Sequence, residues 1–302
     1  MFEFMKILTL RASYECLQNG LLPPYLGSTI RGILGHCIHE FYCHNSGNKC
    51  YLCEKRENCP YVQCFSNTGG RAGAVNPYTI YVHGQTKEKW KKGEHCVFDI
   101  TLFGKGTEYA GIYLDALLAA EQKGWGAERL LFKLEQVVDP DSERLIYARG
   151  KSWIRNLSPG QFSIEERNAQ YACLVFDTPL RVVSGGELFS KLPFDMLVQF
   201  LIRRISLLTT AYTDVCLEWD LEEMLNQAAA IKTVDECFTE IPFSRYSINQ
   251  KDGKLELPAK AGWILYEGDI SRFVPILELG KSLRIGKGAT IGFGHYEVFY
   301  DK

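Results

Sequence analysis

One stretch decides the fold: LGKSLRIGKGATIGFGHYEVFY, residues 279–300. It places four glycines, two, four and two residues apart, between an apolar segment and a final run rich in aromatic residues. Glycine costs conformational entropy on folding and adds no packing, so a loop with four of them needs a reason. One reason is a turn that leads into a bulged strand. The other is a backbone that approaches a phosphate closely, because no Cβ stands in front of its amides.

The charge of the chain is small in total but uneven along the sequence. The net charge of −2 by itself argues against a nucleic-acid partner. Residues 214–240, however, hold eight acids and one lysine, a local charge of −7, whereas residues 281–295 carry three basic residues, no acid and a local charge of +3. Because the local field steers a phosphate chain, a basic groove can exist within these totals.

The composition is that of a globular protein. The 302 residues are 46% hydrophobic and 23% charged, which fits one large domain or two ordinary ones and does not indicate disorder. No apolar run approaches the roughly 18 residues of a membrane span, and we interpret MFEFMKILTL at the start as a first strand instead of a signal peptide. Eleven cysteines are too few for a secreted disulfide scaffold of this length, so we expect reduced thiols and a cytoplasmic location.

The two halves of the chain open alike. Each reads as a strand, Leu-Arg, a polar loop, a proline followed by an aromatic residue, and an apolar-periodic helix. The segment RNLSPGQFS separates them, so we predict domains at 1–158 and 159–302. Periodicity within each half predicts the order βαββαβ, an α+β chain of two tandem ferredoxin-like (RRM-type) domains. We expect strands at 95–103, 129–139, 263–270 and 295–300, and helices at 28–42, 109–124 and 271–283, the last interrupted by Pro275.

These features resemble a known family. The pattern G-x-G-x3-G-x-G, between a helix and a final strand, is similar to the C-terminal signature of the RAMP superfamily of CRISPR proteins. Residues 243–298, together with DTPLRVVSGGEL and LIRRISLLTTAY, resemble the CRISPR precursor-RNA processing endoribonucleases in particular. The resemblance implies that the two domains bind CRISPR repeat RNA and cut precursor crRNA. It makes these loop residues RNA-binding candidates: Arg284, Gly286, Lys287, Gly288, Gly292, Gly294 and His295.

The predicted helix 28–42 carries two histidines on one face. His36 and His39 are i, i+3 neighbours, and helical periodicity puts Gly32 and Gly35 beside them, which lowers the surface so that another group can come close. The opposite face is expected to be buried. Its apolar stripe consists of Ile30, Ile33, Leu34, Cys37, Ile38 and Phe41.

Metal-independent RNA cleavage suits these residue types. A base removes the 2′-hydroxyl proton and an acid protonates the leaving 5′-oxygen, and histidine does either near neutral pH. His36 and His39 are our base and acid candidates. Tyr25 is an auxiliary catalytic candidate, and Arg31 is a candidate for RNA contact. The resemblance implies a histidine from this region as well. The alternative is that both histidines are solvated surface residues or ligands of the neighbouring cysteine site.

A cysteine-rich insertion at about 43–64 follows this helix. Cys43, Cys50, Cys53 and Cys59 have the spacing C-x6-C-x2-C-x5-C, which in a reduced compartment is typical of a metal site. Four thiolates favour zinc, with an iron–sulfur cluster as the alternative and Cys64 as a spare ligand. Such a site has no open position for water, so its role would be structural and no catalytic metal is expected. The competing interpretation is a set of free or partly oxidised thiols.

The sequence therefore favours an endoribonuclease that leaves a 2′,3′-cyclic phosphate and a 5′-hydroxyl. Its partners would be CRISPR repeat RNA, as precursor crRNA, and proteins of a CRISPR effector complex, with no membrane partner. The first alternative is a non-catalytic RNA-binding RAMP subunit of an interference complex. The second is a protein-interaction module that docks a partner through the cysteine site and the acidic stretch. RNA binding that weakens steeply with salt would count against the second alternative.

Overall fold

The computed structural model describes residues 2–43, 50–66, 75–84, 87–246 and 254–301. They form two compact units, an N-terminal unit of residues 3–162 with 207–215, and a C-terminal unit built mainly of residues 163–206 and 216–301. Within the described part of the chain, no helix is long and apolar enough to cross a membrane.

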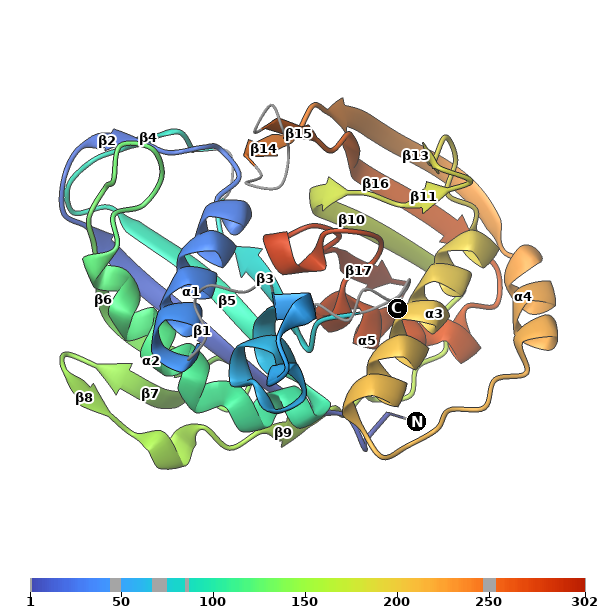
Figure 1. Cartoon of the computed structure of the whole chain (residues 1–302). Helices are drawn as coiled ribbons and strands as arrows, with labels where there is room; N and C mark the ends of the chain where they lie inside the picture. The colour runs from blue at the N-terminus through green and yellow to red at the C-terminus, as the bar shows by residue number, and fades with distance from the viewer. Residues whose placement is uncertain (1, 44–49, 67–74, 85–86, 247–253, 302) are drawn as a thin grey trace. The chain divides into compact units, whose positions relative to one another are not determined.

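The N-terminal unit is a sheet with two helices (Figure 1). Its strands lie in the order β3–β5–β1–β6–β7–β8, with β9 also paired to β1, and every neighbouring pair is antiparallel. The main elements are β1 (Lys6–Cys16), α1 (Gly27–Tyr42), β3 (Tyr78–Val82), β5 (His95–Phe103), α2 (Ala110–Ala119) and β6 (Phe132–Asp139). Shorter strands are β2 (Gly20–Leu21), β4 (Lys89–Trp90), β7 (Arg144–Ala148), β8 (Lys151–Ser152) and β9 (Gly160–Gln161).

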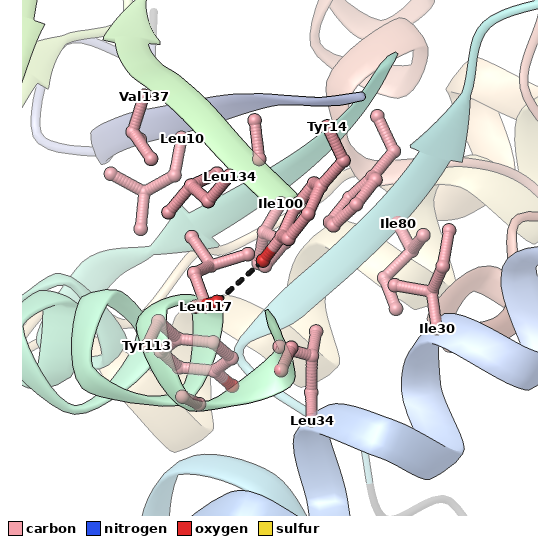
Figure 2. Close-up of a cluster of buried hydrophobic side chains, with 14 of the residues drawn as sticks. Leu10, Tyr14, Ile30, Leu34, Ile80, Ile100, Tyr113, Leu117, Leu134 and Val137 are labelled. Carbon is pink, nitrogen blue, oxygen red and sulfur yellow. Dashed lines mark hydrogen bonds between the residues drawn. The ribbon is translucent and has the colours of Figure 1, made fainter. Parts of the chain in front are cut away.

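Alternating burial along β1 builds the core of this unit. Leu8, Leu10, Ala12 and Tyr14 are fully buried, whereas the residues between them are more exposed, because successive strand residues point to opposite faces. Figure 2 shows Leu10 and Tyr14 of β1 together with Ile30 and Leu34 of α1 and Tyr113 and Leu117 of α2. The Tyr14 hydroxyl donates to the Leu117 carbonyl at 2.6 Å, and burial raises the pKa of Tyr14 well above its usual value.

The C-terminal unit repeats the arrangement (Figure 1). Its sheet has the antiparallel order β13–β16–β10–β17. The elements are β10 (Tyr171–Leu180), α3 (Phe194–Tyr212), β13 (Lys232–Ile241), β16 (Ala259–Glu267), α5 (Val274–Leu283) and β17 (Glu297–Tyr300), with α4 (Leu221–Ala229) and the ribbons β11 (Val183–Ser184)–β12 (Glu187–Leu188) and β14 (Ser244–Tyr246)–β15 (Lys254–Glu256) added. In both units the first strand lies between the third and fourth strands of the motif, so the predicted tandem ferredoxin-like fold is confirmed.

One detail of the prediction was wrong. Pro275 does not interrupt a helix, because the segment before it is a short 3₁₀ turn and α5 begins at Val274, which places the proline in the first helical turn. The backbone N–H that proline lacks would have no helical partner at this position, so proline is compatible with a helix start.

We expect Tyr14→Phe to lower the free energy of unfolding by about 1 kcal/mol, because the buried Leu117 carbonyl loses a hydrogen bond. Urea denaturation followed by circular dichroism measures the change. Tyr171→Phe is the control, since the Tyr171 hydroxyl donates to Glu267 at the surface. Equal effects of the two variants would contradict the assignment of a stabilising role to the buried bond.

Candidate functional site

The two histidines lie where the sequence placed them, on α1. His36 is exposed and His39 is half-buried, and as i, i+3 neighbours they lie on one side of the helix. The Tyr61 ring lies edge-on to the His39 ring, with 5.0 Å between their centroids. His36 is thus accessible, whereas His39 is partly covered by the Tyr61 ring.

Two residues of α1, Gly35 and Phe41, do not have the exposure that the sequence predicted. Gly35 is buried instead of exposed, because the Phe65 ring packs on it and a Cβ there would lie 2.6 Å from Phe65 Cε1. Phe41 was expected in the buried stripe but is 50% exposed. The sequence predicted that another group comes close to the helix at these glycines. At Gly35 this group is the Phe65 side chain of the same unit, whereas Gly32 faces open space.

Arg31 and Tyr25 lie closer to the start of α1. The Arg31 guanidinium donates through Nε to the Tyr78 hydroxyl at 3.2 Å and stacks over the Phe65 ring, 5.2 Å from its centroid. Tyr25 precedes the helix, is half-buried, and has a pKa raised by burial.

The predicted cysteine ligands Cys43, Cys50, Cys53 and Cys59 are all partly exposed. Burial raises the pKa of the Cys50 thiol, and the charges of Cys43, Cys59 and Cys53 raise it further. Yet among the described residues no group of three or more His, Cys, Asp or Glu side chains is arranged to hold a metal ion. The intervening residues 44–49 lie outside the described part. Cys64, the predicted spare, is buried, and its pKa is raised by burial to about 12.

The four glycines of the loop after α5 all have left-handed backbone conformations. Their φ angles are +78°, +93°, +90° and +72° at positions 286, 288, 292 and 294. A Cβ on Gly286 would lie 2.6 Å from the Arg181 carbonyl oxygen, and one on Gly294 would overlap the Ile285 carbonyl oxygen. The glycines therefore let the chain fold tightly against itself, which is the turn interpretation of the sequence.

Most amides of this loop are also used internally. The Gly294 amide donates to Pro179 at the end of β10, and the Lys287 amide donates to Arg181 just beyond it. The amides of the loop that donate to backbone carbonyls are those of Ile285, Lys287, Ile291, Gly292, Phe293 and Gly294. A phosphate would thus find few of these donors, and the loop offers mainly shape and side chains.

The basic character of the loop is smaller than its local charge of +3 indicates. Lys281 pairs with Glu297 at 2.9 Å and with Glu278 at 3.6 Å. Arg284 is only 5% exposed and donates to the Lys281 carbonyl. The one basic side chain of this stretch that the structure shows as exposed is Lys287.

His295 is a buried residue of the C-terminal unit. It is 7% exposed, and its Nδ1 lies 2.5 Å from Asp177 Oδ1. Burial lowers the pKa of His295, although Asp177 acts in the opposite direction. The side chain is consequently internal and presents little surface for direct RNA contact.

Sequence reasoning missed a charged cluster on the sheet of the N-terminal unit. Asp99 accepts two hydrogen bonds from Arg11, each 2.8 Å long, and lies 3.2 Å from Nε2 of His83. Arg11 and Asp99 face each other across β1 and β5, on the side opposite the buried Leu10 and Ile100. Only the strand register brings these residues together, so their spacing in the sequence gave no signal. Burial raises the pKa of the Asp99 carboxyl group, but Arg11 and His83 together lower it below its usual value. The carboxylate therefore stays charged and can position an imidazole.

Two family models match the sequence. One, described as the CRISPR-associated endoribonuclease Cas6, matches residues 174–296, and one described as an N-terminal domain matches residues 4–159. The C-terminal part of this chain is thus similar to Cas6, and together with the solved structures below, this supports a Cas6-type CRISPR RNA processing protein. The match confirms the predicted resemblance to the CRISPR precursor-RNA processing endoribonucleases, and it includes the glycine loop. No match was found among curated proteins.

Solved Cas6 structures share the fold at low sequence identity. A structure described as a partial Cas6-RT-Cas1–Cas2 complex has a TM-score of 0.65 and 11% identity, with 99% of this chain and 47% of that chain covered. Cas6 of Thermus thermophilus has a TM-score of 0.57 and 11% identity, with 98% and 99% covered. A Cas6 product complex has a TM-score of 0.56 and 12% identity, with 97% and 100% covered. This chain thus spans about half the length of the first relative and nearly all of the other two.

We expect Gly35→Ala to destabilise the N-terminal unit by about 1–3 kcal/mol, because the added methyl group overlaps the buried Phe65 ring. Gly32→Ala, one turn earlier on the same helix, meets open space and is expected to stabilise the unit by up to about 1 kcal/mol. Thermal and urea unfolding of the two variants measure the difference. A destabilising Gly32→Ala together with a neutral Gly35→Ala would refute the packing described.

We expect Gly294→Ala to cost about 2–4 kcal/mol of stability in the C-terminal unit, because it combines a left-handed φ with overlap of the Ile285 carbonyl. Lys287→Ala in the same loop is the control, and its exposed side chain predicts no change. Circular dichroism during urea unfolding gives both values. A Gly294→Ala protein as stable as the control would show that the loop does not need the glycine for folding.

Proposed function

We propose that this chain is a metal-independent endoribonuclease that binds CRISPR repeat RNA and cleaves precursor crRNA. The observation that carries the proposal is the exposed His36 and the half-buried His39, which lie together on α1 of a chain whose residues 174–296 match the Cas6 model. Two adjacent imidazoles can supply both proton transfers that cleavage requires. One of the solved relatives is described as a Cas6 product complex.

The reaction uses the RNA as its own nucleophile. One imidazole accepts the proton of the 2′-hydroxyl, and the 2′-oxygen attacks the adjacent phosphorus. The bond from phosphorus to the 5′-oxygen breaks, and the second imidazolium donates its proton to that oxygen. The products are a 2′,3′-cyclic phosphate and a 5′-hydroxyl, and the two histidines end with their protonation states exchanged.

Arg31 is the cation that we propose for the charge that develops on the phosphate. It lies on the same helix as the two histidines, and the Tyr78 hydroxyl and the Phe65 ring hold its guanidinium. A preorganised cation costs little reorganisation when negative charge develops. Tyr25 is protonated near neutral pH, as a phenol normally is, and burial raises its pKa further, so its role would be to donate a hydrogen bond to the RNA instead of acting as a base.

In the glycine loop, Lys287 is the proposed direct phosphate contact, since its side chain is exposed. Gly286, Gly288, Gly292 and Gly294 would act through the shape of the loop, and the buried Arg284 and His295 would support it from inside. Phosphate contacts of this kind position an RNA without reading its sequence.

The proposed cofactor is a structural zinc ion at Cys43, Cys50, Cys53 and Cys59, with an iron–sulfur cluster as the alternative. The proposal is supported by the chemistry of the donors alone, because four free, partly exposed thiols are soft ligands, whereas the described side chains are not arranged around an ion. When bound, the metal would crosslink the segment after α1 and take no part in the chemistry. Proteins of a CRISPR effector complex are proposed as further partners, in line with the solved Cas6-RT-Cas1–Cas2 complex.

Cleavage of the repeat RNA from the chain's own CRISPR array, in excess EDTA, tests the function. We expect wild type to make a single cut with a cyclic-phosphate end, whereas His36→Ala and His39→Ala lose about 10²–10⁴-fold in rate, the usual contribution of a general acid or base. His95→Ala is the control, since His95 is an exposed histidine paired with Glu135 on the sheet.

The same samples separate the function from its alternatives. RNA affinity is measured by filter binding over a range of salt, and folding in EDTA by circular dichroism. Folded wild type that binds the repeat without cutting it would instead make the chain a non-catalytic RNA-binding subunit. An equal loss of cleavage in the His95 variant would remove the special role of the α1 histidines.

A further inference from the structure

The cysteine-rich segment lays two aromatic rings on α1. Tyr61, two residues after Cys59, meets the His39 ring at 5.0 Å and an interplanar angle of 83°. Phe65 occupies the space that a side chain at Gly35 would fill. One contact is with the proposed catalytic residue His39, and the other is with Gly35, the residue before His36. The segment therefore borders the proposed site directly.

These rings belong to a continuous aromatic row. Tyr61 stacks on Phe65 at 5.8 Å, and Phe65 stacks on Tyr78 of β3 at 5.2 Å with only 12° between the ring planes. Arg31 lies over Phe65 and is bonded to the Tyr78 hydroxyl. The row therefore contacts two of the proposed functional side chains, His39 at one end and Arg31 in the middle.

The row is anchored in the core of the N-terminal unit. Phe65 is 2% exposed and Tyr78 is fully buried. The Tyr113 hydroxyl of α2 donates to the Cys64 carbonyl at 2.7 Å, which fixes the backbone between the two rings of the segment. Tyr61 also bonds the Ser66 side chain. A ring held in this way can restrict its neighbour without moving itself.

The two histidines consequently differ in freedom. A surface imidazole normally samples several rotamers, and ordering one side chain costs conformational entropy. His36 is exposed, and within the described residues no aromatic ring contacts it. His39 has the Tyr61 ring against it, so part of its ordering is already complete before RNA arrives.

We propose that Tyr61 is a positioning residue that holds the His39 imidazole in the orientation needed for proton transfer. The inference rests on the proposed function and deepens it. It assigns the cysteine-rich segment a task in the reaction, which is to carry Tyr61 and Phe65 to α1. Small errors in the placement of a catalytic group cost large factors in rate, so the contact is worth preserving even though Tyr61 touches no reacting atom.

Three variants test the proposal. Tyr61→Leu removes the ring, Tyr61→Phe keeps the ring and removes only the hydroxyl, and Phe41→Leu removes an exposed ring from the same helix. Single-turnover cleavage at saturating repeat RNA gives the rate, and filter binding gives the affinity. We expect Tyr61→Leu to slow cleavage roughly 10–100-fold with affinity within about twofold of wild type. The Tyr61→Phe and Phe41→Leu proteins should cleave at the wild-type rate.

An NMR readout tests the geometry without RNA. The ring protons of His39 feel the ring current of Tyr61, so their resonances should shift in Tyr61→Leu and stay in place in Tyr61→Phe. The His36 resonances should not move in either variant. The His36→Ala and His39→Ala spectra assign the signals.

The outcomes separate this inference from the proposed function. Wild type that binds RNA and does not cleave it defeats the proposed function, and unchanged His39 resonances in Tyr61→Leu would then defeat the contact as well. Active wild type with an equally active Tyr61→Leu protein overturns the positioning role alone. A rate loss in Tyr61→Phe as large as in Tyr61→Leu would also overturn it, because the ring itself would then not be the cause.

Discussion

Both units depend on one constraint, which is that an antiparallel sheet buries one face under two helices. In the N-terminal unit the side chains of β1 that face α1 and α2 are fully buried, from Leu8 to Tyr14, and this determines which face is left for polar groups. The Arg11–Asp99 pair is a consequence, since both residues are at the alternate positions. The helix α1, which covers this sheet, buries one side in the core and leaves His36 exposed on another.

The glycines show how this constraint extends to the loops. Glycine permits close approach, and the sequence cannot say what approaches. At Gly35 it is Phe65, and at Gly286 and Gly294 it is the backbone of the same unit. In each case a small residue lets a segment outside the helices pack against the sheet-and-helix framework. This packing also sets the positions of side chains such as Lys287 in the loop and Tyr61 beside α1.

Much of the fold was readable because periodicity reports local structure. The strand at 95–103 and the order βαββαβ followed from alternation and helical spacing, and the structure has both. The helix 28–42 was also correct, yet Phe41 is exposed and Gly35 is buried. Periodicity identifies which residues of a helix form its apolar stripe. It does not identify the Phe65 side chain that covers Gly35, because Phe65 belongs to a later segment whose sequence has no helical or strand repeat. The same reason hid His83, whose partner Asp99 lies on a neighbouring strand.

The candidate site was predicted from residue types alone, and the structure shows that the environments of these residues differ between the glycine loop and α1. The charge pattern predicted three cations near the glycines. Lys281, however, is paired with carboxylates and Arg284 is buried, so Lys287 is the residue of the three that is left to attract a phosphate. On α1, by contrast, Arg31 and His39 keep access to solvent while aromatic rings fix their inner sides. A cation or imidazole is most useful when it is ordered before the substrate binds, because the reaction then bears little of the ordering cost. By this criterion the aromatic row orders the Arg31 and His39 side chains in advance, whereas the glycine loop of the C-terminal unit is a tightly folded scaffold with one exposed lysine.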